Sequence, residues 1–299
     1  ESQAILESII NAFEQAGNNN DLQFARAYDC MSNIHIENAA FDKSVSLLKK
    51  SLSIKENYQG EDRIGEIGIT LCALGKVYHR KKEFAKSKDY LLQAKKYIVE
   101  YFGECHVTTS DVYINLGNTY IGMKDYESAK QAYTAHHKIN VKLHGELHFA
   151  VSESYFTFGI YHAQKKEYHK AIESMTKATG ILQKLYGRFS PRIGKMYYYM
   201  GWVYAQLGKL TQSLKYYRES ILNGYKIQSY FLTGVGDTSV HISFPLDFVG
   251  DLKNAINFLK QSNVTFKKYL DRNHGKIRLN SERIMDIEEI ISTSNINLN

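Results

Sequence analysis

Two histidines, His144 and His148, come nearest in this chain to the spacing of a metal site. Side chains four positions apart on one helix can hold a zinc ion together. Gly145 lies between them, however, and no third ligand lies nearby. His148 also repeats the position of His106 at a distance of 42 residues. We therefore interpret both His106 and His148 as link residues that cap the helix that follows them.

Other reactive residues form no catalytic pattern. Cys105 and His106 are adjacent, which is poor geometry for a shared metal, and no nucleophile–base pair or carboxylate pair stands out. Gly234 and Gly236 lack the strand and helix that flank a dinucleotide-binding loop. We expect no enzyme active site, no metal and no cofactor, although a site assembled across several segments stays open.

Composition further restricts the classes of protein to which this chain could belong. The net charge is +7, and basic residues alternate with acidic ones, so we expect no nucleic-acid partner and favour an acidic protein partner. The 3 cysteines have no paired spacing, which indicates a reducing compartment and a cytoplasmic protein. No apolar run approaches about 18 residues, so no membrane span is expected. A start at Glu1 without Met or a signal-like segment fits a processed chain or a piece of a longer one.

A sequence segment that recurs along the chain predicts the helices that would position any functional site. The segment Leu116–Tyr120 reads Leu-Gly-Asn-Thr-Tyr, and related segments recur at intervals of 42 residues. They begin at Leu74, Phe158 and Met200. A degenerate copy, offset by 43 residues, begins at Met31, and in it Ser32 replaces the glycine. A fixed period of this length indicates a helical repeat array.

The glycine of each copy predicts a close contact between helices. Gly75, Gly117, Gly159 and Gly201 lie inside helical patterns, where glycine costs about 1 kcal/mol relative to alanine. A cost that recurs suggests a position where another helix leaves no room for a side chain. An apolar stripe at helical spacing follows each copy, and because no pair buries this stripe alone, neighbouring pairs must stack.

These residues resemble the tetratricopeptide repeat, over residues 22–227. The Gly-x-x-His link at Gly103–His106, followed by a helix that carries Leu-Gly-x-x-Tyr at Leu116–Tyr120, is similar to the kinesin-light-chain type, with a period of 42 where the ordinary repeat has about 34. The resemblance implies an all-α, right-handed superhelical solenoid of antiparallel helix pairs with C-terminal capping helices. The chain departs from the pattern at His162, which replaces a tyrosine, and at His136, where a small residue is usual.

The repeat pattern predicts the domain organisation. We expect an N-terminal capping helix within residues 1–21, with the second half of a truncated repeat as the alternative, and five helix pairs over residues 22–227. The pairs are placed at about 22–58, 63–101, 106–143, 148–185 and 190–227. An irregular link over 228–245 follows, and degenerate C-terminal helices with a polar tail occupy 246–299.

The resemblance also implies a partner-binding groove, lined by the first helix of each pair. Carried over position by position, the groove residues are Asn33, Lys76, His79, Arg80, Ile114, Asn118, Ile121, Phe156, Ile160, Gln164, Lys195, Tyr198, Trp202 and Gln206. Asn33 and Asn118 occupy the position where such repeats often hold an asparagine that binds a peptide backbone. Basic residues at both ends and Trp202 suit an extended acidic peptide with an apolar or aromatic anchor. The alternative is that Trp202 and Phe156 only fill the helix packing.

We therefore expect a non-catalytic adaptor or scaffold that binds protein partners through linear motifs. By family analogy, it would belong to a multiprotein assembly such as a cytoskeletal, motor or ciliary complex. One alternative is a regulator in which a peptide ligand changes the pitch of the solenoid. Another is the tetratricopeptide arm of a larger enzyme.

Overall fold

The computed structural model describes residues 22–188 and 190–225, together with a few single residues further on. The expected capping helix within 1–21 and the link over 228–245 lie outside the described residues, as does nearly all of 246–299. The chain divides into two compact units, Glu1–Glu146 and Leu147–Asn299, which we call unit 1 and unit 2.

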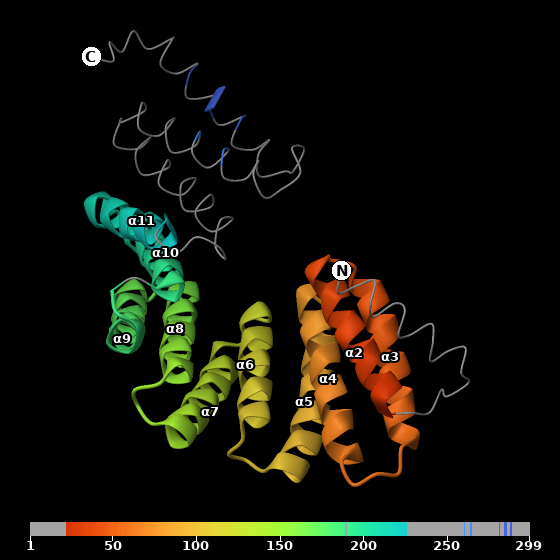
Figure 1. Cartoon of the computed structure of the whole chain (residues 1–299). Helices are drawn as coiled ribbons and strands as arrows, with labels where there is room; N and C mark the ends of the chain where they lie inside the picture. The colour runs from red at the N-terminus through yellow and green to blue at the C-terminus, as the bar shows by residue number, and fades with distance from the viewer. Residues whose placement is uncertain are drawn as a thin grey trace. The chain divides into compact units, whose positions relative to one another are not determined.

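Unit 1 consists of three consecutive helix pairs in its described part (Figure 1). The helices are α2 (Leu22–Glu37), α3 (Phe41–Asn57), α4 (Arg63–Arg80), α5 (Phe84–Phe102), α6 (Val107–Gly122) and α7 (Tyr126–His144). Each first helix packs on its own second helix, and each pair packs on the next, with α4 also touching α2 and α6 directly. The apolar core lies between these helices and includes Leu48, Leu74, Leu91 and Ile98, all fully buried.

Unit 2 contains two further pairs among its described residues. These are α8 (Phe149–Gln164) with α9 (Tyr168–Tyr186), and α10 (Pro191–Gln206) with α11 (Leu210–Tyr225). Its core includes Ala171, Met175, Leu182 and Val203, which are fully buried. All regular elements in the described part of the chain are helices in consecutive pairs, which confirms the all-α array of helix pairs.

The recurring glycine lies where the two helices of a pair touch. A Cβ atom at Gly75 would lie 2.5 Å from Leu91 Cγ, and one at Gly117 would lie 2.2 Å from Tyr133 Cε1. Met175 and Tyr217 crowd Gly159 and Gly201 in the same way, at 2.6 and 2.7 Å. The crowding residue follows its glycine by 16 positions in all four pairs. The predicted close approach of a second helix is confirmed.

Three links between helix pairs begin with a glycine, and two of them end with a capping histidine. Gly103, Gly145 and Gly187 end α5, α7 and α9 with φ values of 85°, 75° and 77°, in the left-handed region that favours glycine. The Nδ1 atoms of His106 and His148 then each accept a hydrogen bond of 3.2 Å from the backbone N–H two residues later. Both histidines therefore cap the next helix, as predicted from their position.

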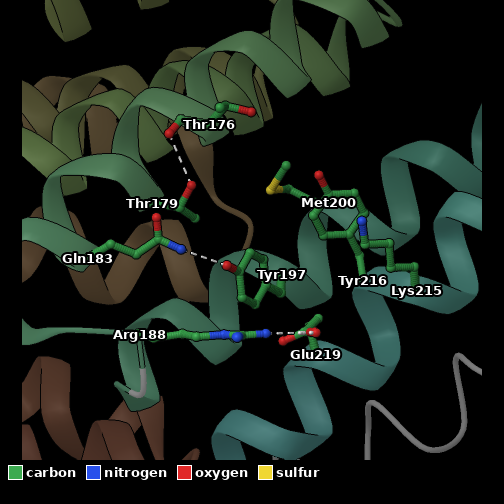
Figure 2. A pocket seen from close by; sticks show the side chains of 9 residues that line it. All are labelled: Thr176, Thr179, Gln183, Arg188, Tyr197, Met200, Lys215, Tyr216 and Glu219. Carbon is green, nitrogen blue, oxygen red and sulfur yellow. Dashed lines mark hydrogen bonds and ion pairs between the residues drawn. The ribbon is translucent and has the colours of Figure 1, made fainter.

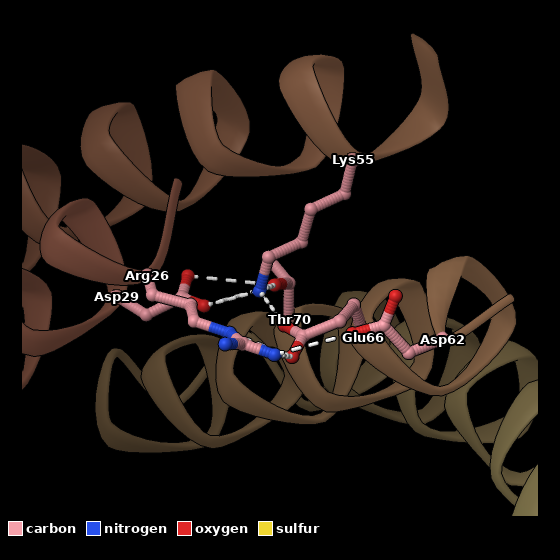
Figure 3. Close-up of polar contacts among 6 residues, drawn as sticks. All are labelled: Arg26, Asp29, Lys55, Asp62, Glu66 and Thr70. Atoms are coloured by element: carbon pink, nitrogen blue, oxygen red, sulfur yellow. Dashed lines mark hydrogen bonds and ion pairs between the residues drawn. The ribbon is translucent and has the colours of Figure 1, made fainter. Parts of the chain in front are cut away.

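A buried charge cluster joins α2, α3 and α4, and the repeat pattern gave no sign of it (Figure 3). The side chain of Lys55 is fully buried, and its Nζ lies 2.8 Å from Glu66 Oε2 and 2.5 Å from Asp29 Oδ2. Lys55 also donates to the hydroxyl of Thr70, at 2.9 Å. Arg26 then donates to Glu66 from a second side, at 2.6 Å. The cluster ties the first helix pair to the second.

Candidate partner-binding faces

The first helices of unit 1 bring together most of the residues predicted for its part of the groove. Lys76 and Arg80 are exposed, four positions apart on α4. Ile114, Asn118 and Ile121 are partly exposed along neighbouring α6, at the spacing of one helical stripe. We call these five residues the unit 1 face. Asn33, on α2, is also exposed.

The amide of Asn118 is oriented from behind by a tyrosine. The hydroxyl of Tyr133, on α7, donates to Asn118 Oδ1 at 2.8 Å. Burial raises the pKa of the Tyr133 hydroxyl, so this donor stays protonated at neutral pH. Because Oδ1 is engaged, the amide N–H groups of Asn118 are the ones suited to meet a carbonyl of a bound chain.

His79 has a different position from the other predicted groove residues. It is half-buried, with Nδ1 3.4 Å from Thr119 Oγ1 and its ring 5.4 Å from the Phe84 ring. Burial, assisted by the neighbouring Arg80, lowers the pKa of His79, so the imidazole is neutral at pH 7. His79 therefore links α4 to α6 and adds no positive charge to the face.

Sequence reasoning missed Asn115, which lies on α6 beside Ile114. Its Nδ2 donates to the backbone carbonyl of Asp111 and lies 3.7 Å from Cys72 Sγ on α4. The side chain thus bridges the first helices α4 and α6. Asn115 precedes Asn118 by three residues, and residues at this spacing are neighbours on the surface of a helix. This spacing could have identified Asn115 as a candidate site residue.

In unit 2 the predicted residues divide between surface and core. Lys195, Gln206 and Gln164 are exposed, and Ile160, Tyr198 and Trp202 are partly exposed. We call these six residues the unit 2 face. Phe156 is only 6% exposed and belongs to the core, with its ring 5.2 Å from Tyr199 and edge-on to it. Lys195 Nζ covers Phe156 at 5.1 Å from the ring centroid, so Phe156 packs the unit and is not accessible to a ligand.

The position of Trp202 fits both roles considered from the sequence, a contact with a bound ligand and packing between helices. Part of the indole packs against the core of unit 2, and part stays exposed. A half-exposed aromatic ring on a rigid helix can bury apolar area with little loss of side-chain entropy. Because it is the one tryptophan of the chain, its emission would report on this face alone.

Comparison with protein families identifies the repeats. The model described as tetratricopeptide repeat matches residues 66–140, 108–184 and 158–221, which together span more than half of the chain. The chain belongs to the tetratricopeptide repeat family. No match was found among curated protein sequences.

Solved structures with the same architecture are distant in sequence. BtubC (BKLC) from P. vanneervenii is 16% identical with a TM-score of 0.64, over 76% of this chain and 91% of that one. A Rap protein complexed with Competence and Sporulation Factor is 14% identical with a TM-score of 0.61, over 90% and 76%. A putative kinesin light chain from Podosopora anserina, with nearly identical TPR-like repeats, is 12% identical with a TM-score of 0.54, over 68% and 96%. At these identities the likeness shows the fold alone.

One polar cluster in these tetratricopeptide repeats resembles a serine-type catalytic triad in composition. Ser110 Oγ lies 2.8 Å from His136 Nδ1, and Asn140 Nδ2 lies 3.2 Å from His136 Nε2. Nδ1 also lies 3.0 Å from the carbonyl of Ser110, which can only accept, so Nδ1 carries the proton. A protonated Nδ1 cannot take the proton of the serine, and all three side chains are buried. The cluster therefore packs α6 against α7.

We expect His136 to make the stability of the chain fall as the pH is lowered. Burial lowers the pKa of His136 below the usual 6.5, so below that pH the unfolded chain takes up a proton that the folded chain does not. Protonation would also place an N–H at Nε2, facing the amide donor of Asn140. The free energy of unfolding, measured in urea between about pH 8 and pH 5, should decrease toward the acid end.

The matched variant is His136→Gln. It should be less stable than the wild type at high pH and lose less stability on acidification. Some dependence should remain, because burial also lowers the pKa of His79 and His137. An unchanged dependence on pH in the variant would show that His136 does not carry this effect.

Within the described residues, no three metal-binding side chains lie close enough together to hold a metal ion. In the same part of the chain, no helix is both long enough and apolar enough to span a membrane.

Proposed function

We propose that this chain is a non-catalytic tetratricopeptide-repeat adaptor that binds acidic linear motifs of partner proteins on its first-helix faces. The observation that supports it most is the unit 1 face, where an oriented Asn118 amide lies on the helix next to the exposed cations Lys76 and Arg80. The asparagine supplies a hydrogen bond to a main chain of any sequence. The two cations add a preference for carboxylates.

Charged and apolar contacts would contribute differently to the binding of such a motif. Exposed charge pairs mainly speed association and select the partner, whereas buried aromatic and apolar contacts supply most of the affinity. Ile114 and Ile121 offer apolar area on unit 1, and Trp202 offers it on unit 2. A motif with carboxylates around an apolar or aromatic side chain would therefore use both kinds of group.

We place the adaptor in a cytoplasmic multiprotein assembly of the cytoskeletal, motor or ciliary kind. Support comes from the 42-residue period and from the fold shared with the repeats of a putative kinesin light chain. A second candidate is a peptide-responsive regulator. The solved Rap protein, which matches over 90% of this chain, is complexed with Competence and Sporulation Factor, and a ligand of that kind would compact the solenoid on binding.

The test is affinity capture from native extract with three baits. One is the wild type, and the second carries Lys76→Glu, Arg80→Glu and Lys195→Glu on the two faces. The third carries the same charge change at exposed lysines of second helices, as Lys96→Glu, Lys138→Glu and Lys184→Glu. We expect the wild type and the third bait to recover the same defined partners and the second to lose them. Equal recovery by all three would remove the faces from the proposal.

A partner peptide identified in this way separates adaptor from regulator. Binding to the unit 2 face should change the emission of Trp202. For an adaptor, small-angle scattering should give the same radius of gyration with and without the peptide. A clear decrease of the radius on peptide addition would favour the regulator.

A further inference from the structure

Unit 2 contains a hollow that the proposed function does not use. It lies between α9, α10 and α11 and has a volume of about 360 Å³ (Figure 2). Met200 is buried in its lining, and the partly exposed rings of Tyr197 and Tyr216 line it as well. The volume is within the range of ligand sites in proteins.

The hollow and the unit 2 face lie on different sides of α10. Successive residues of a helix turn by about 100°, so Lys195, Trp202 and Gln206 share one side. By the same rotation, Tyr197 and Met200 point in nearly the opposite direction. A ligand in the hollow would therefore contact second helices α9 and α11 and leave the unit 2 face free.

The aromatic residues of the hollow are held in place by their neighbours. The ring of Tyr216 stacks on Tyr204, with centroids 5.1 Å apart and an interplanar angle of 6°. The ring of Tyr197 lies 5.7 Å from Tyr216, and its hydroxyl accepts a hydrogen bond of 2.9 Å from Gln183 Nε2. Rings fixed before binding lose little entropy when a ligand is bound.

Among the described residues that line the hollow, positive charge is in excess. Arg188, in the link after α9, and Lys215, on α11, both line it, and Glu219 is the one acid among these residues. Arg188 Nη2 lies 3.6 Å from Glu219 Oε1, which is longer than a good hydrogen bond. Within the described part of the chain, exposed Lys215 takes part in no ion pair. Lys215 could therefore bind a ligand carboxylate without breaking an ion pair of its own.

We propose that this hollow is a second docking site, which receives one aromatic side chain of an acidic segment of a partner protein. The aromatic ring packs between Met200 and the rings of Tyr197 and Tyr216. The flanking carboxylates lie against Lys215 and Arg188. This site does not depend on the first-helix faces, so a partner could occupy both at once.

The test uses the peptide acetyl-Asp-Glu-Phe-Asp-Glu-amide as the probe, with the full chain labelled at its methionine methyl groups. The Met200 signal, assigned with a Met200→Leu variant, reports on the hollow by NMR. Trp202 emission reports separately on the unit 2 face. We expect the probe to shift the Met200 signal in a saturable way and Lys215→Glu to weaken that binding by about tenfold or more. Lys195→Glu, on the other side of α10, should change the affinity of the probe for the hollow by less than twofold.

Three control ligands test which parts of the probe the hollow recognises. The neutral peptide with Asn and Gln in place of the acids, and the acidic peptide with Ala in place of Phe, should both bind much more weakly. Hydrocinnamate, a free aromatic acid, should bind more weakly than the peptide. The proposal is overturned by an unmoved Met200 signal, by equal binding of the neutral peptide, or by equal binding to Lys215→Glu. Hydrocinnamate binding as tight as that of the peptide would overturn it too and make the hollow a small-molecule site. A shift of Trp202 emission alone would support only the first-helix face.

Discussion

Replacing Lys55 with alanine should lower the free energy of unfolding by about 3–5 kcal/mol, because it removes one partner from a buried ion pair. The Lys55 side chain is fully buried, and its ammonium group lies between Asp29 and Glu66. The substitution would leave Asp29 without its cation and open a cavity between α2, α3 and α4. Urea unfolding followed by circular dichroism measures the loss, and hydrogen exchange should show faster opening of these three helices.

A partly exposed lysine, Lys81, provides the matched control. Lys81 also contacts two carboxylates, Asp42 at 2.7 Å and Glu83 at 3.0 Å, but Asp42 is 90% exposed. Exposed ion pairs contribute little because water and salt screen them. Lys81→Ala should therefore leave the unfolding midpoint almost unchanged. Equal effects of Lys55→Ala and Lys81→Ala would show that the buried cluster does not hold the first two pairs together.

Replacing Gly117 with alanine should destabilise unit 1 by about 2–3 kcal/mol, although alanine is the better helix former. The new Cβ would lie 2.2 Å from the Tyr133 ring, and the ring is itself buried. The ring must move, which would also weaken its hydrogen bond to Asn118. We therefore expect weaker partner binding at the unit 1 face together with the lower stability.

Gly180, in α9, gives the opposite expectation for the same substitution. A Cβ at Gly180 would meet no atom within 4 Å. Gly180→Ala should therefore stabilise the chain by about 0.5–1 kcal/mol, the usual gain in helix propensity. Both variants can be compared in one series of thermal unfolding curves. Similar changes at the two positions would contradict the packing role assigned to Gly117.

The sequence predicted features that recur at the same position in several repeats. The crowded glycines, the capping histidines and the order of the helix pairs could all be predicted because each has one local cause that acts several times. His136 was noticed only as an exception to the pattern. Its partners Ser110 and Asn140 lie on two helices, and periodicity does not indicate which polar side chains meet across them.

Single features were harder to predict. The Lys55 cluster draws on residues from 26 to 70, which lie in the degenerate first copy of the repeat and at the start of the second. Charges along a helix usually lie on its solvated side. Phe156 occupies a first-helix position like the other groove residues, but the ring of Tyr199 and the side chain of Lys195 cover it. The hollow of unit 2 depends on the shapes of three helices together, so no single motif marks it.

The matching links after α5 and α7 have a consequence for how the gene can change. Each of the links at Gly103 and Gly145 starts with a left-handed glycine and reaches a capping histidine three residues later. Joining Cys105 directly to His148 would delete one period of 42 residues and leave a link of the same length, glycine and cap. Recombination between such segments would lengthen or shorten the protein by whole helix pairs. We therefore expect the array to gain or lose binding surface in evolution by one helix pair at a time, because each pair contacts only its neighbours.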